Sequence, residues 1–214
     1  MVSNFGNSLS LSEYGNILAT TNYGNNSTYI YYNPDPLPPT PPSLVCFKED
    51  SKILTDNGYI PVQQLRKGDR IKTINNDYVP INMIGFKKIH HKCNPKRIKD
   101  QLYKLCSADY PELTEELVIT GCHSILVDNI SNEQGVMITE MLDRVYTTDG
   151  KFRLPACLDT RASPYEKAGT YTIYHIALEN ENYHGNYGVY ANGLLVETCS
   201  KRYLAELSEM TLLD

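Results

Sequence analysis

A run of prolines divides this 214-residue chain and limits how it can fold. Six of the 12 prolines lie between Pro34 and Pro42, in the string NPDPLPPTPPS. Proline fixes φ and has no amide hydrogen, so such a run favours extended polyproline conformation and cannot supply the donors of a β-ladder. We therefore expect a linker over residues 34–44, between an N-terminal arm (1–33) and a body that begins at residue 45. The length supports one domain with an appendage, so the body should carry the core.

The arm shows a pattern of short strands. Residues 8–11 and 27–32 alternate, residues 17–21 can extend, and Tyr14-Gly15-Asn16 offers a turn. The string FGNSLSLSEYGNILATTNYG, followed by STYIYYN, resembles one FG-GAP repeat, the blade unit of certain β-propellers. A small sheet alone is marginal in water, so we expect the arm to pack on the body or on another protein chain. A flexible arm with a chance likeness is the alternative.

The composition favours β structure and narrows the class of partner. Seventeen Tyr, no Trp and 13 Gly are typical of strands and turns, and the net charge of −5 gives no general attraction for nucleic acid. No stretch approaches 18 apolar residues, and residues 1–12 lack the features of a secretory signal, so we expect neither a membrane span nor secretion. Six Cys without a CxxC pair favour reduced thiols in an intracellular reducing compartment.

The body opens with VCFKEDSKILTDNGYIPVQQLRKGDRIKT, whose parts predict a hairpin and a second strand. Asp56-Asn57-Gly58 supplies residues that tolerate positive φ between two extended runs, and residues 70–74 alternate as a half-buried strand. Apolar residues at helical spacing predict short helices over 138–146 and 201–213.

Three blocks of the body resemble the Hint superfamily, the autoprocessing domains of hedgehog proteins and inteins. The first block begins at Cys46, in the nucleophile position, and the second, LVITGCHSILV, carries Thr120 and His123 in a T-x-x-H arrangement. The last, YHIALENENYHGNYGVYANGLLVETC, has Asn192-Gly193 as a hairpin turn and ends at Cys199. The same late stretch is similar to Hint-containing proteins of large DNA viruses.

The resemblance implies an all-β fold over residues 45–200. We expect a two-lobed horseshoe of long hairpins that brings Cys46, Thr120, His123 and Cys199 together, with the helix of residues 201–214 over one edge. It also implies a chemistry. The Cys46 thiol would attack the carbonyl carbon of Val45, the residue before it, and turn the scissile amide into a thioester by an N-to-S acyl shift. His123 would protonate the departing amine and Thr120 would bind the peptide or the oxyanion, with Cys199 as an internal acyl acceptor.

The sequence differs from both inteins and hedgehog-type domains at residues that decide what happens to the thioester. Inteins end in His-Asn, but Glu197 and Thr198 stand there and cannot cyclise, so complete splicing is not expected; His175 and Tyr187 also replace an expected Asp and His. Hedgehog-type domains carry a carboxylate where Gly85 stands, so sterol transfer is not expected either. Cleavage or transfer of the arm, or no reaction, remains open. The protein would then be at most a single-turnover autoprotease that acts on itself.

A structural role is the alternative function. An inert Hint scaffold could use the arm to reach neighbouring chains, as in a capsid-associated component of a virus particle. We expect no cofactor, no membrane or nucleic-acid partner, and no metal. The candidate zinc ligands match no zinc-finger spacing: His90, His91, Cys93, Cys106, Cys122 and His123. Cys93, Cys106 and Cys157 are interpreted as structural, and the basic run 87–104 as a solvated insertion.

Overall fold

The computed structural model describes residues 9–11, 17–22, 27–32, 43–75 and 77–213. Most of the expected linker, residues 34–42, lies outside these ranges. The chain divides into two compact units, residues 1–41 and 42–214. Each unit is described by itself.

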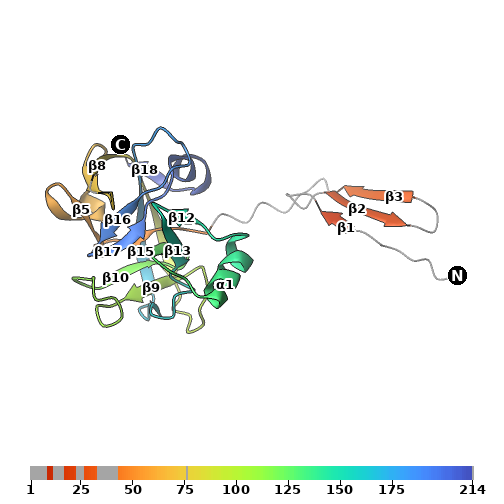
Figure 1. Ribbon diagram of the computed structural model, residues 1–214, viewed down its shortest axis with the longest axis horizontal. Helices are drawn as coiled ribbons and strands as arrows, with labels where there is room; N and C mark the ends of the chain where they lie inside the picture. Colours follow the sequence, from red (N-terminus) through yellow and green to blue (C-terminus); the bar gives the residue numbers. More distant parts are fainter. Residues whose placement is uncertain (1–8, 12–16, 23–26, 33–42, 76, 214) are drawn as a thin grey trace. The chain divides into compact units, whose positions relative to one another are not determined.

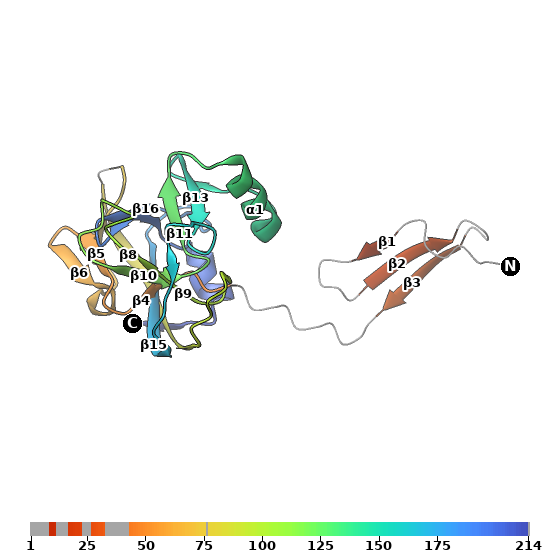
Figure 2. The ribbon, with the colours of Figure 1, turned by 90° about the horizontal axis from the view of Figure 1, so that it is seen from below.

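The first unit is a three-stranded antiparallel sheet (Figures 1 and 2). Strand β2 (Ile17–Asn22) lies between β1 (Leu9–Leu11) and β3 (Ser27–Tyr32), with Leu9 opposite Thr20 and Ile17 opposite Tyr32. The three predicted strands of the arm are therefore confirmed, and the predicted turn at Tyr14-Gly15-Asn16 lies outside the described residues. Ile30 and Tyr31 at the end of β3 are exposed, at 70% and 50%.

The second unit is built almost entirely from antiparallel strands, which confirms the all-β expectation. Its strands are β4 (Phe47–Lys48), β5 (Lys52–Thr55), β6 (Gly58–Pro61), β7 (Arg70–Lys72), β8 (Tyr78–His91), β9 (Leu102–Leu105), β10 (Leu117–Thr120), β11 (Ser124–Val127), β12 (Thr147–Thr148), β13 (Lys151–Pro155), β14 (Ser163–Pro164), β15 (Gly169–Leu178), β16 (Gly188–Ala191), β17 (Leu194–Glu197) and β18 (Thr211–Leu213). The helical elements within the described residues are the 3₁₀ turn η1 (Val62–Gln64), the helix α1 (Asn132–Leu142) and the turn η2 (Tyr203–Leu207).

Two groups of strands meet along the long strand β8. One group runs β12-β13-β11-β17-β16-β5-β7, and the other runs β15-β4-β10-β9-β14. Residues 78–80 of β8 pair with β7, whereas residues 81–91 pair with β15. Two apolar clusters are buried, and the larger one contains residues from both groups of strands. The larger cluster contains Phe47, Ile53, Tyr103, Ile119 and Val196, and the smaller contains Cys46, Leu102, Cys199, Leu204 and Met210.

Two predicted hairpin turns are confirmed. Strands β5 and β6 pair around Asp56-Asn57-Gly58, with Thr55 opposite Gly58. Strands β16 and β17 pair around Asn192-Gly193, both of which have positive φ, at 48° and 99°. Two successive positive φ values are what a two-residue hairpin requires and what Asn-Gly adopts most easily.

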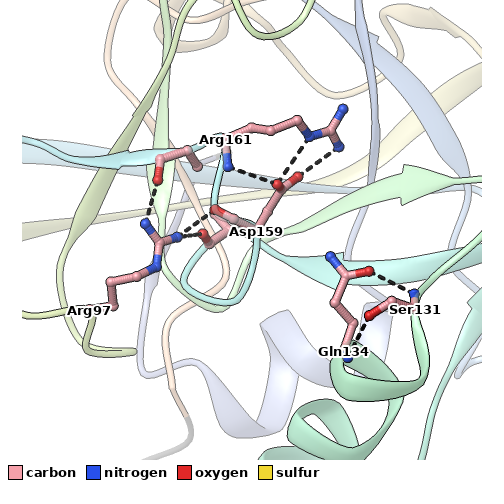
Figure 3. Close-up of polar contacts among 7 residues, drawn as sticks. Arg97, Ser131, Gln134, Asp159 and Arg161 are labelled. Atoms are coloured by element: carbon pink, nitrogen blue, oxygen red, sulfur yellow. Dashed lines mark hydrogen bonds and ion pairs between the residues drawn. The ribbon is translucent and has the colours of Figure 1, made fainter.

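Helix α1 begins earlier than predicted. Its N-cap, Ser131, accepts a hydrogen bond from the Gln134 backbone N–H, and the Gln134 side chain accepts one from the Ser131 backbone N–H (Figure 3). This capping box starts the helix at Asn132 rather than near residue 138, because it satisfies amide donors that a helix start leaves free. The helix ends at Asp143, which has φ of 66°. No helix of the described residues is long and apolar enough to cross a membrane.

The predicted C-terminal helix is correct only in its first part. Residues 201–207 are helical, but Thr211–Leu213 form β18, which pairs with residues 84–86 of β8. Strand β7 covers β8 only at residues 78–80, so the edge of β8 at residues 84–86 is open to another strand. Backbone groups left unpaired at a buried edge are costly, and β18 satisfies them where a longer helix would not.

The basic run 87–104 is attached to the body rather than simply solvated. The Arg97 guanidinium donates to the backbone oxygens of Ala156, Cys157 and Ala162, at 2.8, 2.9 and 2.6 Å. It also donates to the backbone oxygen of Asp159, and Figure 3 shows it directed at the loop that carries Asp159 and Arg161. In the same loop, the buried Asp159 carboxylate pairs with Arg161 at 2.8 Å. Arg97 therefore fixes the backbone of residues 156–162, which lies beside the turn that carries His123.

Candidate active site

The chain enters the body directly at the predicted scissile bond. Immediately after Cys46, strand β4 inserts between two strands of one group: Phe47 pairs with Ile119 of β10 on one side and with Tyr174 of β15 on the other. Both Cys46 and Phe47 are fully buried, whereas Val45 is half-buried. The apolar Cys-Phe pair thus fixes the depth at which the preceding peptide bond is held.

Two side-chain hydroxyl groups form hydrogen bonds with the segment that leads to Cys46, one on each side of it. The Thr120 hydroxyl accepts from the Cys46 N–H at 2.9 Å and donates to the Leu44 oxygen at 2.7 Å. The Tyr203 hydroxyl accepts from the Val45 N–H at 3.1 Å and donates to the Ser43 oxygen at 3.3 Å. Successive residues of an extended chain direct their polar groups to opposite sides, so the two hydroxyls together hold the segment extended.

The backbone of Thr120 also forms a hydrogen bond with Cys46. Its N–H donates to the Cys46 oxygen at 3.0 Å, so Thr120 contacts both polar groups of that residue. The expected contact between Thr120 and the peptide is therefore present, at the nitrogen of the scissile amide. Among the described residues, no donor is bonded to the Val45 oxygen, the atom that would carry the oxyanion.

His123 lies in the turn between β10 and β11 and is completely buried. Its ring packs 4.4 Å from the Phe47 ring, centre to centre, and its Nε2 lies 3.2 Å from the Glu197 backbone oxygen. Burial lowers the pKa of His123 to about 4, although the backbones of Cys46 and Glu197 oppose the shift. The contact with the Glu197 oxygen is a hydrogen bond in the tautomer that carries the hydrogen on Nε2, and Nδ1 has no hydrogen-bond partner among the described residues.

The Cys46 thiol is covered by the C-terminal segment. Its Sγ lies 3.8 Å from the Sδ of Met210, the residue just before β18. Burial raises the pKa of the Cys46 thiol, and the charge of Lys87 offsets only part of that shift. A Cβ on Gly85 would lie 2.7 Å from Leu204 and 3.1 Å from Met210, so the same apolar segment leaves little room for a side chain at Gly85.

Cys199 belongs to the same buried cluster as Cys46. Its thiol and its N–H both point to the Ile176 oxygen, each at 3.2 Å. Burial raises the pKa of the Cys199 thiol, and the nearby Cys46 and Glu197 add to the shift. The fold therefore brings the four predicted residues into one region, with both thiols in their neutral form.

The two residues that replace the intein ending are held firmly in place. The Glu197 side chain is buried and its carboxylate lies 3.1 Å from Nε of Arg153. Burial raises the pKa of Glu197, and Arg153 opposes that shift. The Thr198 oxygen accepts from the Asn186 side chain at 2.8 Å, and its hydroxyl accepts from the Tyr187 N–H at 2.9 Å.

His175 and Tyr187, the two other residues that differ from the expected intein pattern, differ in how far they are buried. His175 is fully buried, with its ring 5.1 Å from that of His123 and 5.6 Å from that of Phe47, and neither of its ring nitrogens has a partner. Burial and the neighbouring His123 lower the pKa of His175 well below its usual value. Tyr187 is only half-buried, and its hydroxyl donates to the Glu179 oxygen at 2.9 Å.

A cavity of about 510 Å³ opens beside the scissile bond. Val45 and Tyr203 line one part of it, and residues 197–200 line another. The residue before Cys46 therefore lies in the wall of this cavity.

The remaining cysteines and histidines form no metal site in the described part of the chain, where no three His, Cys, Asp or Glu side chains gather. His91 is buried and bonds the Tyr165 oxygen at 2.6 Å. The Cys122 thiol contacts that of Cys157, and the hydrogen bond between them lowers the pKa of Cys122 and raises that of Cys157. Cys93 and Cys106 are half-exposed.

Sequence reasoning did not identify Tyr203 or Met210 as residues of the site. Both were interpreted as apolar positions of a C-terminal helix. Tyr203 is 158 residues from Val45 and Met210 is 164 residues from Cys46, so no local pattern links them to the scissile bond.

Comparison with solved structures finds a match to the gp41-1 intein, with 15% identity, coverage of 71% of this chain and 96% of that chain, and a TM-score of 0.37. A bacterial intein-like domain from Clostridium thermocellum matches with 11% identity, coverage of 73% of this chain and 99% of that chain, and a TM-score of 0.39. No curated protein has a sequence that matches this chain. The Hint domain family model matches residues 45–202, which is most of the chain, so the protein belongs to the Hint domain family.

Proposed function

We propose that this protein processes itself by an N-to-S acyl shift at Cys46, followed by cleavage or transfer of the N-terminal arm. The observation that carries the proposal is the 2.9 Å hydrogen bond between the Thr120 hydroxyl and the Cys46 N–H. It ties the nitrogen of the scissile amide to the T-x-x-H turn, beside a buried His123 with a free Nδ1. Membership of the Hint domain family supports the same reaction class.

The residues suggest an order of proton transfers. Neutral His123 would take the Cys46 thiol proton on Nδ1 while sulfur attacks the Val45 carbonyl carbon. The imidazolium would then return that proton to the Cys46 nitrogen as the carbon–nitrogen bond breaks. Thr120 keeps the nitrogen in place, and Tyr203 holds Val45 from the other side. The products are a thioester between Val45 and Cys46 Sγ and a free amine on Cys46, so atoms and charge balance.

Intact-protein mass spectrometry tests this reaction. The wild-type chain and Cys46→Ala are incubated with dithiothreitol or hydroxylamine, which trap thioesters. We expect the wild type to separate into residues 1–45, carrying the added nucleophile, and residues 46–214, while Cys46→Ala stays intact. An unchanged wild-type mass under all conditions would refute autoprocessing.

The buried state of the thiol favours a second candidate, a structural protein on a Hint scaffold. Cys46 is neutral and covered by Met210, and no described donor serves the Val45 oxygen. Such a protein would use the arm to bind neighbouring protein chains, as a capsid-associated component of a virus particle does. Sedimentation of the full chain beside residues 43–214 tests this role, which predicts that only the full chain associates.

A further inference from the structure

The cavity beside Val45 carries an excess of positive charge. Arg144, Arg153 and Arg202 line it, and Glu197 is the one acidic residue among its lining residues. The whole chain has a net charge of −5, so this local sign is opposite to that of the molecule. A cavity of one charge with low-dielectric walls concentrates small ions of the opposite charge.

The positive charges differ in how far they are already paired. Arg153 is paired with Glu197 at 3.1 Å, and Arg202 makes an exposed pair with Glu206 at 3.3 Å, which contributes little. Arg144 stacks on the Tyr146 ring at 4.6 Å and forms no ion pair within the described residues. Stacking leaves the edge of a guanidinium open to a carboxylate, so Arg144 and Arg202 are available to a ligand.

We propose that this cavity is the acyl-acceptor site and that it takes a thiol or amine nucleophile bearing a carboxylate. The inference rests on the proposed thioester at Cys46. Arg144 and Arg202 bind the carboxylate, and the nucleophilic atom reaches the Val45 carbonyl carbon. A thiol acceptor forms a new thioester with Val45, the bond to Cys46 Sγ breaks, and the acceptor's proton passes to the Cys46 thiolate. An amine acceptor forms an amide by the same exchange.

A matched pair of thiols tests the preference for a carboxylate. 3-Mercaptopropionate and 3-mercaptopropionamide differ only in the carboxylate and its neutral amide counterpart. The rate of arm release by each is measured by mass spectrometry and divided by its rate with a small peptide thioester in solution, which removes differences in thiol reactivity. We expect the acid to be about tenfold faster than the amide after this correction, as charge-assisted hydrogen bonds to a carboxylate imply.

Arginine variants test which side chains cause the preference for the acid over the amide. Arg144→Gln and Arg202→Gln change exposed side chains, so the fold should tolerate them, and together they should bring the acid-to-amide ratio close to one. Arg70→Gln is the matched control, because Arg70 is also exposed and, like Arg202, pairs with a carboxylate, that of Asp56 at 3.9 Å, but does not line the cavity. It should leave the ratio unchanged.

The outcomes separate this inference from the proposed function. An acid-to-amide ratio near one in the wild type, with dithiothreitol still releasing the arm, would overturn the acceptor site alone. If dithiothreitol releases nothing, the autoprocessing proposal fails, and the carboxylate site is then tested by binding to Cys46→Ala. NMR titration of Cys46→Ala with 3-(methylthio)propionate and with its amide should show tighter binding of the acid. Arg144→Gln and Arg202→Gln, added to Cys46→Ala, should abolish that preference. Equal binding of both would refute the site.

Discussion

At the scale of single residues, the site depends on hydroxyl groups placed on the backbone. Thr120 contacts the nitrogen of the scissile amide and Tyr203 contacts the amide before it. Both hydroxyls act as hydrogen-bonding groups that fix geometry, so in the proposed reaction proton transfer falls to His123. This division of tasks leads to different predictions for Thr120 and His123.

Removal of the Thr120 hydroxyl should slow arm release without unfolding the protein. We expect Thr120→Ala to lower the rate of release by dithiothreitol about 100-fold, the usual effect of losing one well-placed hydrogen bond in a reacting site. Thr120→Ser keeps the hydroxyl and is the control, with a rate within a few-fold of the wild type. Equal rates for Ala and Ser would show that the hydroxyl does not act in the reaction.

His123 should make the folded state sensitive to acid. Its pKa is about 4 when folded and about 6.5 when unfolded, so between these values the unfolded chain binds more protons. The stabilisation is complete above pH 6.5 and falls as the pH falls toward 4, by about 3 kcal/mol in total. Urea unfolding at pH 7 and pH 4.5 measures it. His123→Gln should reduce the dependence, with the part due to the buried His175 remaining, whereas His90→Gln, at an exposed position, should not reduce it.

At the scale of elements, the strand pair β8–β18 places Met210 against the Cys46 thiol. The hydrogen bonds of β18 with residues 84–86 fix Met210 over the Cys46 thiol. An element at the end of the chain thus covers a residue near its start. The cover is apolar, so it raises the pKa of the thiol as well as excluding reagents.

Shortening the side chain at Met210 should expose Cys46. We expect Met210→Ala to raise the rate at which iodoacetamide alkylates Cys46 by at least about tenfold, because both burial and the raised pKa are relieved. Peptide mapping identifies the modified residue. Met137→Ala, at a side chain that is 45% exposed on α1, is the control. Alkylation of Cys46 that is equally slow in both variants would show that Met210 is not the cover.

The elements also show what sequence could predict. Asn192-Gly193 and Asp56-Asn57-Gly58 act through local backbone preferences, so the hairpins were predictable, as were the strands that flank Thr120 and His123. The strand β18 was not, because Thr211–Leu213 pairs only where β7 leaves the edge of β8 open, a consequence of tertiary structure. The contacts of Tyr203 and Met210 were not predictable either, because these residues lie 158 and 164 residues along the chain from Val45 and Cys46, which they contact.

At the scale of the whole molecule, the chain consists of two units with separate sources of stability. Both buried clusters of the body consist of residues from position 46 onward. The arm contributes its own three-stranded sheet. The bond between Val45 and Cys46 therefore lies at the boundary of the second unit, where its cleavage leaves the core intact.

A chain shortened to residues 43–214 should fold with nearly the same stability as the full protein. It keeps Ser43 and Leu44, which bind Tyr203 and Thr120, and loses nothing from either core cluster. We expect its Tm to lie within about 2 °C of that of the full chain, less than the shift for 1 kcal/mol in a domain of this size. Calorimetry of both chains checks this, and a large decrease would mean that the arm stabilises the body.

The position of β18 along the chain would give protein synthesis a part in the timing of the proposed reaction. Cys46, Thr120 and His123 all leave the ribosome before Met210 does. The contact that covers the thiol cannot exist until residue 210 has emerged, so the nascent chain passes through a period in which the Cys46 thiol lacks this cover. Reagents would reach the thiol most easily in that period, and the pairing of β18 with β8 would end it.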